Sequence, residues 1–481
     1  MEILSTIFLL MSLTILSLFL ILSFLIIRIF TGKSINDPNY APVKGSVLNQ
    51  LLYFSHIYDY QTQIAKKLPT FRLLDIAHSV IFTADTRNIE HILKTNFNKY
   101  EKGTHHQELV RDLWGQGIFA VDGQKWRQQR KLASYEFSTR VLRDFSCSVF
   151  RIYAAKLVRA VSELTASRQV IEFQDLLMKY TMESMFKVGF GIDLNCMEGS
   201  SEEGTTFVKA FDDANESLRL RYFNTFWKLK RALNIGSEAS LKKNIKVIDN
   251  FIHNVLSAKK KLLAMNPNPN VKEDILSRFL MESEKNPETM TDQYLRDIIL
   301  NFLLAGKDTA ANALSWFFYM LCKHPLVQEK VAQEVIDIAC SKGNDASVDD
   351  FITTITDATL EKMHYLHAAL TETLRLYPPV RRDGRCSQAD DILPDGHKVK
   401  KGDMVAYLAY PMGRMPSIWG EDAEVFRPER WLKDGVFQPE SPFKFVAFHA
   451  GPRVCLGKEF AYRQMKIFSI ALARYFCFKI S

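Results

Sequence analysis

The N-terminal end of the chain is the segment that most limits how this sequence can fold. Residues 3–27 carry no charge over 25 positions and are rich in leucine and isoleucine. As an α-helix this run would be about 38 Å long, enough to cross a hydrocarbon core of roughly 30 Å with some tilt. The only earlier charge is Glu2, whereas Arg28 and Lys33 follow the run.

A cleaved signal peptide is the alternative interpretation of this run. No basic residues precede it and no small-x-small cleavage pattern follows it, which favours an uncleaved membrane helix. The positive charges on its C-terminal side indicate that the rest of the chain lies in the cytosol. We therefore expect an anchor over residues 1–30, a polar linker over residues 31–50 and a single globular domain over residues 51–481.

The composition beyond the anchor is that of a globular protein. The 481 residues are 47% hydrophobic and 24% charged, and the net charge of +8 is too modest to argue for nucleic-acid binding. The seven cysteines are widely spaced without a C-x-x-C pair, which argues against a disulfide framework or a cysteine-rich zinc site. Thiols in a reducing compartment fit best.

Helical periodicity dominates the domain. Helices are expected at residues 124–145, 173–186, 245–265, 291–322, 326–339, 360–376 and 456–476, and strands at residues 70–74, 80–84 and 404–407. This balance predicts a mainly α fold with small β-sheets, of the α+β type. The apolar segment 291–322 contains Arg296, Asp297, Lys307 and Asp308, so we expect a buried core helix rather than a second membrane span.

The most specific motif is the segment Phe448-His449-Ala450-Gly451-Pro452-Arg453-Val454-Cys455-Leu456-Gly457. Gly451 and Gly457 allow a tight turn and a close backbone approach to a flat ligand. Cys455 precedes an apolar helix, whose N-terminal N–H groups and dipole favour a thiolate over a thiol. A single cysteine is more often only a small buried apolar residue, so the complete pattern carries the interpretation.

A second motif, Ala305-Gly306-Lys307-Asp308-Thr309, lies inside the long apolar helix. Gly306 weakens a helix, and the Thr309 hydroxyl can compete for a backbone carbonyl, so a local kink could open here. An acid beside a hydroxyl is suited to relaying protons to bound dioxygen. The alternative is a threonine that only bonds back to its own helix.

Two further pairs have helical spacing. Glu372 and Arg375 are three apart, and a later P-E-R segment carries Arg430. Such pairs are usually exposed, so a surface ion pair is the alternative here. Trp126 and Arg130 are four apart and share a helix face.

Two other patterns resemble ligand sites but lack the required context. Residues 115–120 match G-x-G-x-x-A, yet a helix-like stretch rather than a strand precedes them, so we reject a dinucleotide site. His364 and His367 lack the H-E-x-x-H form, and we expect ordinary helix residues there rather than zinc ligands.

The motifs F-x-x-G-x-R-x-C-x-G, A-G-x-D-T, E-x-x-R and W-x-x-x-R together resemble those of cytochrome P-450 enzymes, from about Tyr40 to the end of the chain. The sequences of residues 117–123, 221–223, 274–279 and 385–396 are similar to those of the plant fatty-acid ω-hydroxylase clan. The resemblance implies the cytochrome P-450 fold and a monooxygenase that inserts oxygen from O₂ into long-chain fatty acids at the endoplasmic reticulum membrane. Electrons from NADPH would come through a separate reductase.

The resemblance also implies roles for individual residues. Cys455 would be the axial ligand of haem b iron, and a thiolate ligand favours O–O cleavage. The cofactor would contact Trp126, Arg130, Ala305, Gly306, Phe448, Gly451, Arg453 and Gly457, with Trp126, Arg130 and Arg453 at its propionates. Asp308 and Thr309 would be catalytic, while Glu372, Arg375 and Arg430 would be a buried structural cluster.

Partners are less constrained. A basic face of Lys131, Arg140, Arg143, Lys444 and Lys458 could receive an acidic reductase, and scattered solvated charges are an equal alternative. The substrate pocket is expected along residues 113–120, upstream of Ala305 and at residues 380–383. Arg381 and Arg382 depart from the apolar or proline-containing pair expected there, and could meet a carboxylate or solvent.

The C-terminal end is the second departure. The chain stops at Ser481, where family members continue with strands that close the substrate pocket. The sequence therefore leaves open a haem-binding but catalytically inactive protein. A haem-thiolate lyase or isomerase that needs no dioxygen is a third possibility, against which Asp308 and Thr309 argue.

Overall fold

The structure is a computed structural model, and it places two compact units within one chain. It describes residues 2–31, 34–75, 79–168, 170–194, 202–224, 226–265, 274–285, 287–288, 290–339 and 347–480. Cys196, Cys340 and Lys33 lie outside these residues. The first unit comprises Met1–Glu101, Val380–Val425 and Ser441–Val454, and the second comprises Lys102–Pro379, Phe426–Glu440 and Cys455–Ser481.

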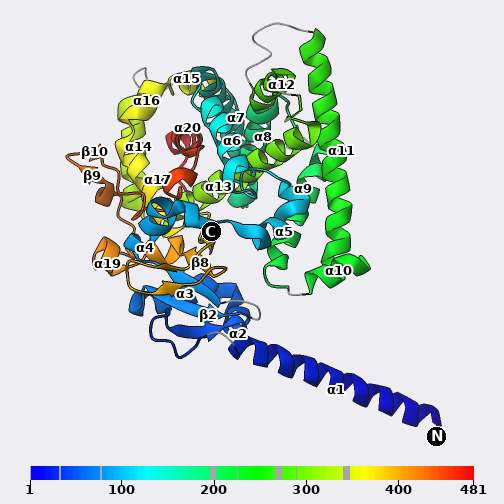
Figure 1. Cartoon of the computed structure of the whole chain (residues 1–481). Coiled ribbons are helices and arrows are strands. Elements are labelled where there is room, and N and C mark those ends of the chain that lie inside the picture. The colour runs from blue at the N-terminus through cyan, green and yellow to red at the C-terminus, as the bar shows by residue number, and fades with distance from the viewer. Residues whose placement is uncertain are drawn as a thin grey trace. The chain divides into compact units, whose positions relative to one another are not determined.

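The first unit begins with α1 (Glu2–Phe30), the dark-blue helix that carries the N label in Figure 1. Its apolar side chains are exposed along nearly the whole helix. Ser5–Phe30 is long and apolar enough to cross a membrane, and no other helix of the described part of the chain meets this criterion. The predicted N-terminal helix is therefore present, three residues longer at its C-terminal end than the uncharged run.

A mixed sheet forms the centre of the first unit. Its strands are β1 (Val43–Ser46), β2 (Thr70–Leu74), β3 (Ser79–Thr83), β4 (Tyr100–Glu101), β5 (Asp383–Ser387) and β8 (Met404–Tyr407), in the order β1-β2-β3-β8-β5-β4. Phe71 pairs with Phe82 across β2 and β3, and Ile81 pairs with Val405 across β3 and β8. These side chains are fully or almost fully buried in the apolar core of this unit.

Small elements complete the first unit. They are α2 (Val47–Leu52), α3 (Ile57–Lys67), α4 (Thr86–Glu90), α18 (Ala409–Met412), α19 (Pro416–Trp419) and the strand pair β6 (Asp391–Ile392) and β7 (Lys398–Val399). The predicted strands 70–74 and 404–407 are found with those bounds, and the strand expected at 80–84 lies one residue earlier.

The second unit is almost entirely helical. It contains α5 (Gly103–Trp114), α6 (Gly123–Phe137), α7 (Arg140–Ala166), α8 (Phe173–Phe190), α9 (Glu202–Arg221), α10 (Trp227–Leu233), α11 (Gly236–Met265), α12 (Ile275–Lys285), α13 (Asp292–Lys323), α14 (Pro325–Ala339), α15 (Val348–Thr353), α16 (Asp357–Lys362), α17 (His364–Leu376), α20 (Lys458–Tyr475) and a hairpin of β9 (Leu432–Lys433) and β10 (Val436–Phe437).

The long helix α13 organises this unit. It packs against α5, α8, α11, α12, α14, α17 and α20, and α8 runs along much of its length (Figure 1). Thr291 caps its N-terminus by accepting a hydrogen bond from the backbone N–H of Tyr294, and Pro325 begins the next helix. The expectation of a buried core helix at residues 291–322 is confirmed.

Two expected helices were wrong, because each is divided in the structure. The run 124–145 breaks between α6 and α7, where the Thr139 hydroxyl accepts from the N–H of Leu142 and starts a new helix. The run 360–376 breaks at Met363, between α16 and α17. The expected mainly helical class with small sheets is confirmed.

Candidate cofactor and oxygen site

Cys455 lies just before α20 in the second unit. Its side chain is exposed, and the backbone N–H of Gly457 donates to its sulfur. Desolvation by surrounding protein atoms raises the pKa of the thiol, while the Gly457 N–H, Arg130 and Lys458 lower it. The helix terminus therefore supplies the expected donor, but in the protein alone desolvation outweighs it. A bound metal ion would itself remove the proton from a coordinating thiol.

A row of aromatic rings joins the Cys455 helix to two other helices. Phe460, in the first turn of α20, packs edge-on against Phe137 at the end of α6, with ring centroids 6.2 Å apart. Phe137 packs in turn on Phe302 of α13 at 5.3 Å. Phe302 lies less than one turn before Ala305. This row therefore joins α6, α13 and α20 within the second unit.

The α6 motif presents two residues on one face. Trp126 is 5% exposed, whereas Arg130, one turn later, is half-buried. Desolvation lowers the pKa of the Arg130 guanidinium, and the negative charge of a Cys455 thiolate raises it. This coupling means that Arg130 is close enough to Cys455 to interact electrostatically. Trp126 and Arg130 therefore lie one turn apart on α6, as their spacing predicts, and their role at a propionate stays a prediction.

The motif of residues 305–309 in α13, called the oxygen motif below, differs in exposure from the helix around it. Leu303 and Lys307 are buried, yet Ala305 between them is exposed. Thr309 donates its hydroxyl to the carbonyl oxygen of Ala305 at 2.6 Å, which is the back-bonded arrangement considered as the alternative. Asp308 is 39% exposed and accepts from the ammonium of Lys307 at 3.0 Å.

Lys307, to which the sequence assigned no role of its own, is a buried cation. Its ammonium also pairs with Asp212 of α9 at 2.5 Å. Burial lowers the pKa of this ammonium, but Asp308 and Asp212 outweigh burial and raise it above its ordinary value. Lys307 therefore stays charged and ties the acid of the oxygen motif to α9.

Gly306 has a different use from the one expected. Residues 292–323 form one continuous helix, so no break marks a kink at Gly306. A Cβ at this position would lie 2.1 Å from the terminal methyl of Met185 on α8. Gly306 thus leaves room for the Met185 side chain of α8, and its contact with a cofactor stays a prediction.

Glu372, Arg375 and Arg430 come together as a buried cluster. The Glu372 carboxylate accepts from Nε and Nη2 of Arg375, at 2.7 Å each, and from Nε of Arg430 at 3.4 Å. The backbone N–H of Arg427 and the indole N–H of Trp431 complete its partners. The alternative of an exposed surface pair is wrong, because none of the three charged side chains is more than 8% exposed.

The first part of the cysteine segment belongs to the first unit. His449 and Gly451 have positive φ values of 61° and 66°, and residues 451–453 form a single 3₁₀ turn. A Cβ on Gly451 would lie 1.9 Å from the carbonyl oxygen of Leu93. The expected tight turn is present, and the close approach here is to protein backbone. Phe448 packs on Phe445, and Arg453 is half-buried.

Arg381 and Asp383 both contact other parts of the protein. The Arg381 guanidinium lies over the rings of Tyr58 and Tyr410, 5.0 and 5.9 Å from their centroids. Asp383 accepts from the buried Arg385 at 2.6 Å, and it also accepts from the backbone N–H of Gly384 and from Tyr407, and lies 3.3 Å from His449. Arg385 is therefore a buried cation beside the cysteine segment that sequence reasoning missed, since nothing in its spacing singled it out.

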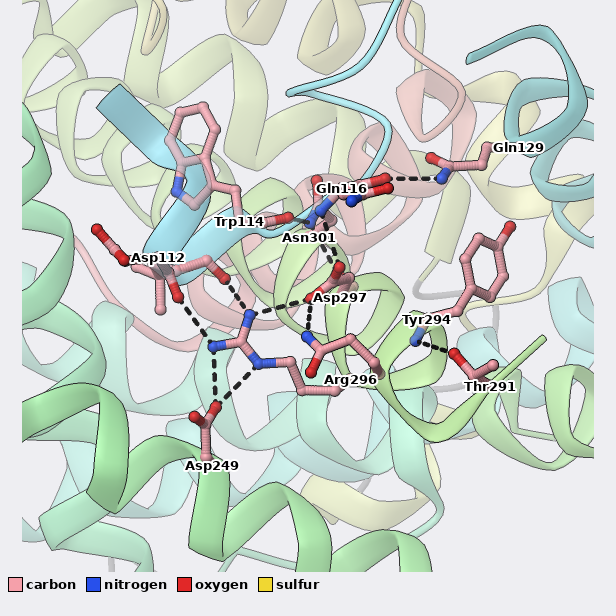
Figure 2. Close-up of polar contacts among 12 residues, drawn as sticks. Asp112, Trp114, Gln116, Gln129, Asp249, Thr291, Tyr294, Arg296, Asp297 and Asn301 are labelled. Carbon is pink, nitrogen blue, oxygen red and sulfur yellow. Dashed lines mark hydrogen bonds and ion pairs between the residues drawn. The ribbon is translucent and has the colours of Figure 1, made fainter. Parts of the chain in front are cut away.

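The loop at residues 115–120 lies against α13, as Figure 2 shows. The backbone N–H of Gln116 donates to Asp297 at 2.8 Å, and that of Phe119 donates to Asn301 at 3.3 Å. Gly115 and Gly117 face these two side chains so closely that a Cβ on either would lie 2.1 Å from them. The two glycines of the G-x-G pattern therefore allow the loop to pack closely on α13. This use of the glycines differs from the one that a dinucleotide site would make of them. Residues 113–120 do adjoin the helix segment upstream of Ala305.

The proposed basic face is partly neutralised within the protein. Arg140 and Arg143 share the carboxylate of Asp144, both at 3.3 Å, and Arg143 also approaches Asp357 at 3.4 Å. Lys444 belongs to the first unit, where its ammonium lies 4.6 Å from the ring centroid of Trp419. Lys458 is half-buried, whereas Lys131 is exposed. The ion pairs of Arg140 and Arg143 reduce the charge that these two residues offer to an acidic partner.

Known proteins resemble the chain along nearly its whole length. The sequence pattern of the cytochrome P-450 family matches residues 36–481. Cytochrome P-450 704C1 from Pinus taeda is 49% identical over 450 residues, which cover 92% of this chain and 87% of that protein. Cytochrome P-450 704B1 from Arabidopsis thaliana is 40% identical over 98% of this chain and 95% of that protein, and cytochrome P-450 86B1 from the same plant is 42% identical over 81% and 70%.

These matches confirm the resemblance to the plant fatty-acid ω-hydroxylase clan that the sequence motifs predict. The family implies a haem-thiolate cofactor, dioxygen, an apolar substrate and a reductase. With a match of this extent, the chain belongs to the cytochrome P-450 family of haem-thiolate monooxygenases.

Proposed function

We propose that this chain hydroxylates long-chain fatty acids at the ω end, using O₂ and electrons that a separate reductase delivers from NADPH. The observation that carries the proposal is the aromatic row Phe460–Phe137–Phe302, because it links the cysteine helix α20 to α6 and to the oxygen motif of α13. The similarity to plant relatives of the 704, 86 and 94 groups supports the substrate class.

Cys455 is the proposed axial ligand of haem b. Cys455, just before α20, and Ala305, within α13, are both exposed although many residues of these two helices are buried. Such exposure is expected of residues that would line the binding site of a flat group. Arg130 and Trp126 of α6 would hold the propionates, together with Arg453. Phe448, Gly451 and Gly457 keep the neighbouring roles that the motif predicts, and Glu372, Arg375 and Arg430 support the fold.

Bound haem supplies the iron at which dioxygen is activated with two electrons, so that one oxygen atom enters a C–H bond and the other leaves as water. The residues of this chain supply the protons. Asp308 is partly exposed to solvent, and Thr309 is the next residue in the sequence. In the proposed relay Asp308 takes protons from water, and Thr309 passes them on after releasing the Ala305 carbonyl.

α1 supports a proposal for the membrane anchor and the location of this protein. We propose that residues 1–30 anchor the protein in the endoplasmic reticulum membrane, with residues 31–50 as a linker and residues 51–481 as a cytosolic catalytic domain. The exposed apolar side chains along α1 support this, since such a surface is unfavourable in water. The reductase would dock through Lys131, Arg140, Arg143, Lys444 and Lys458.

Two measurements on one preparation test this function. The full chain is expressed in yeast microsomes with a plant reductase, and the carbon-monoxide difference spectrum of the reduced protein is recorded. Lauric, palmitic and stearic acids are then supplied with NADPH, and the products are identified. The Cys455→Ala variant is compared with Cys322→Ala, which removes another free cysteine of the second unit.

The expected result is the long-wavelength Soret band of a thiolate-ligated carbon-monoxide complex, together with ω-hydroxy acids. Cys455→Ala should abolish both, and Cys322→Ala should keep both. The band without any hydroxylated product would support the alternative of a haem-binding protein without turnover. Bound haem that lacks this band in the unmodified chain would contradict the ligand role of Cys455.

A further inference from the structure

The loop between α5 and α6 is held to α13 by a set of side-chain contacts that leaves few of its backbone groups unsatisfied. Asn301 donates its amide N–H to the carbonyl oxygen of Trp114 at 3.0 Å and accepts from Phe119. Gln129 of α6 donates to the carbonyl oxygen of Gln116 at 2.8 Å. Figure 2 shows these side chains converging on the loop. A loop with its polar groups paired in this way is ordered before any ligand arrives.

Arg296, also on α13, provides hydrogen-bond donors for the C-terminal carbonyl groups of α5. The last carbonyl groups of a helix have no partner inside the helix. Arg296 donates to the carbonyl oxygens of Asp112 and Leu113, at 3.1 and 2.8 Å, and also pairs with Asp249 of α11 at 2.9 Å. Its positive charge lies at the negative end of the α5 dipole, which is the favourable orientation.

The chemistry of the two central side chains is specific. Asp297 accepts hydrogen bonds from Gln116, Gln293 and Arg296 and donates none. This position therefore requires a carboxylate. Asn301 must donate twice, to Trp114 and to the carbonyl oxygen of Asp297, and accept once. Only a primary amide of this length provides that combination.

The contacts that Asp297 and Asn301 make with the loop are called the clamp below. Their position along α13 connects the clamp to the oxygen motif. Asp297, Asn301, Ala305 and Thr309 follow one another at intervals of four residues, which form a ridge on a helix surface. Each step of four residues rises about 6 Å. An acyl chain that reaches Thr309 along this ridge would pass the loop that Asn301 holds.

We infer that Asp297 and Asn301 are positioning residues that fix the loop of residues 115–120 and so restrict which carbon of an acyl chain reaches the oxygen motif. This inference rests on the proposed function for its substrate class. Gly115 and Gly117 contribute to this positioning, because their lack of a side chain lets the loop approach Asp297 and Asn301. Specificity would then depend on a preformed loop position rather than on a direct contact between these two residues and the substrate.

Backbone amide exchange of the full chain tests the clamp without needing turnover. The variants are Asp297→Asn, which removes one acceptor oxygen and the charge, and Asn301→Asp, which removes both donors. Asn312→Asp on the same helix is the matched control, since the Asn312 side chain accepts from Gln174 of α8 and makes no hydrogen bond to the loop among the residues that the structure describes. Exchange of the peptide covering residues 113–121 should accelerate by about tenfold or more in both clamp variants, as hydrogen bonds to charged or buried groups are lost, and should be unchanged in the control.

Product analysis with palmitic acid tests the specificity. Both clamp variants should lose the preference for one carbon and yield a mixture of positions, while the carbon-monoxide spectrum and the Asn312→Asp products stay as in the unmodified chain. Unchanged exchange would overturn the clamp, and faster exchange with an unchanged product position would overturn its link to specificity. If the unmodified chain oxidises no fatty acid, the proposed function fails, and the exchange data still decide whether Asp297 and Asn301 hold the loop.

Discussion

The carboxylate of Glu372 accepts two hydrogen bonds from Arg375 at 2.7 Å each, and the exposed fractions of these side chains are only 0% and 1%. Trp431 and Arg430 use the same carboxylate, so one acid neutralises a cation and pairs an indole N–H in the interior of the second unit. Burying a charge is costly unless it is paired and hydrogen-bonded, so this cluster is stable only as a complete set.

The Glu372→Gln variant should therefore be strongly destabilised. It leaves the buried Arg375 without its counter-charge, and we expect a loss of about 3–5 kcal/mol in the free energy of unfolding. Glu216→Gln is the matched control, because Glu216 and Arg219 have the same spacing on α9 but are each about half exposed. The control should lose less than about 1 kcal/mol. Urea denaturation followed by circular dichroism measures both, and equal losses would contradict the structural role.

Thr309→Val should separate the catalytic role from the structural one. The change removes the hydroxyl that bonds to the Ala305 carbonyl, and such back-bonding does not favour a helix, so the thermal midpoint should not fall. If Thr309 relays protons, the amount of hydroxylated product per NADPH consumed should drop severalfold, whereas Thr309→Ser should restore it. Thr165→Val removes an equivalent bond, to Val161 on α7, and should leave the ratio unchanged.

The packing role of Gly306 can be measured with a double-mutant cycle. Gly306→Ala adds a Cβ 2.1 Å from the Met185 methyl, so the gain in helix propensity of about 1 kcal/mol is opposed by crowding. In the Met185→Ala background the crowding disappears. The substitution at 306 should then be more favourable by about 1–3 kcal/mol than in the unmodified protein. Additive effects of the two changes would show that α8 does not constrain this glycine.

Much of this architecture follows from local signals in the sequence. The apolar run that begins at Thr291 predicts α13, and short apolar segments predict β2 and β8. The spacing of Glu372 and Arg375 places both on one turn of a helix. In each of these cases the pattern lies within a few residues of the structure it predicts.

Other features depend on partners that are distant in the sequence. Asn301 binds backbone groups of residues more than 180 positions earlier, and backbone groups carry no residue-specific signal. Gly115 and Gly117 mimic a nucleotide motif because both uses of glycine allow a close approach, here to Asp297 and Asn301. The break at Thr139 was missed since a capping threonine competes with an otherwise continuous helical pattern.

His367 offers a test of how burial controls stability against pH. Its ring packs between Tyr462 and Phe437, with centroid distances of 4.2 and 4.1 Å. Burial lowers the pKa of this imidazole from 6.5 to about 3, and the nearby Lys466, Lys458 and His364 add to the shift. The folded protein therefore keeps the ring neutral at a pH where the unfolded chain binds a proton.

The sign follows from proton linkage. Between about pH 6.5 and pH 3 the unfolded state binds one more proton at this site, so stability falls as the pH falls through this window and is unaffected above it. At pH 5 the loss from this residue should be about 2 kcal/mol relative to pH 7.5. His367→Phe keeps an aromatic ring between Tyr462 and Phe437 but cannot be protonated, so urea midpoints measured at both pH values should differ less than in the unmodified chain. His253→Phe, at an exposed position of α11, should retain the full difference, and an equal reduction in both variants would contradict the assignment to His367.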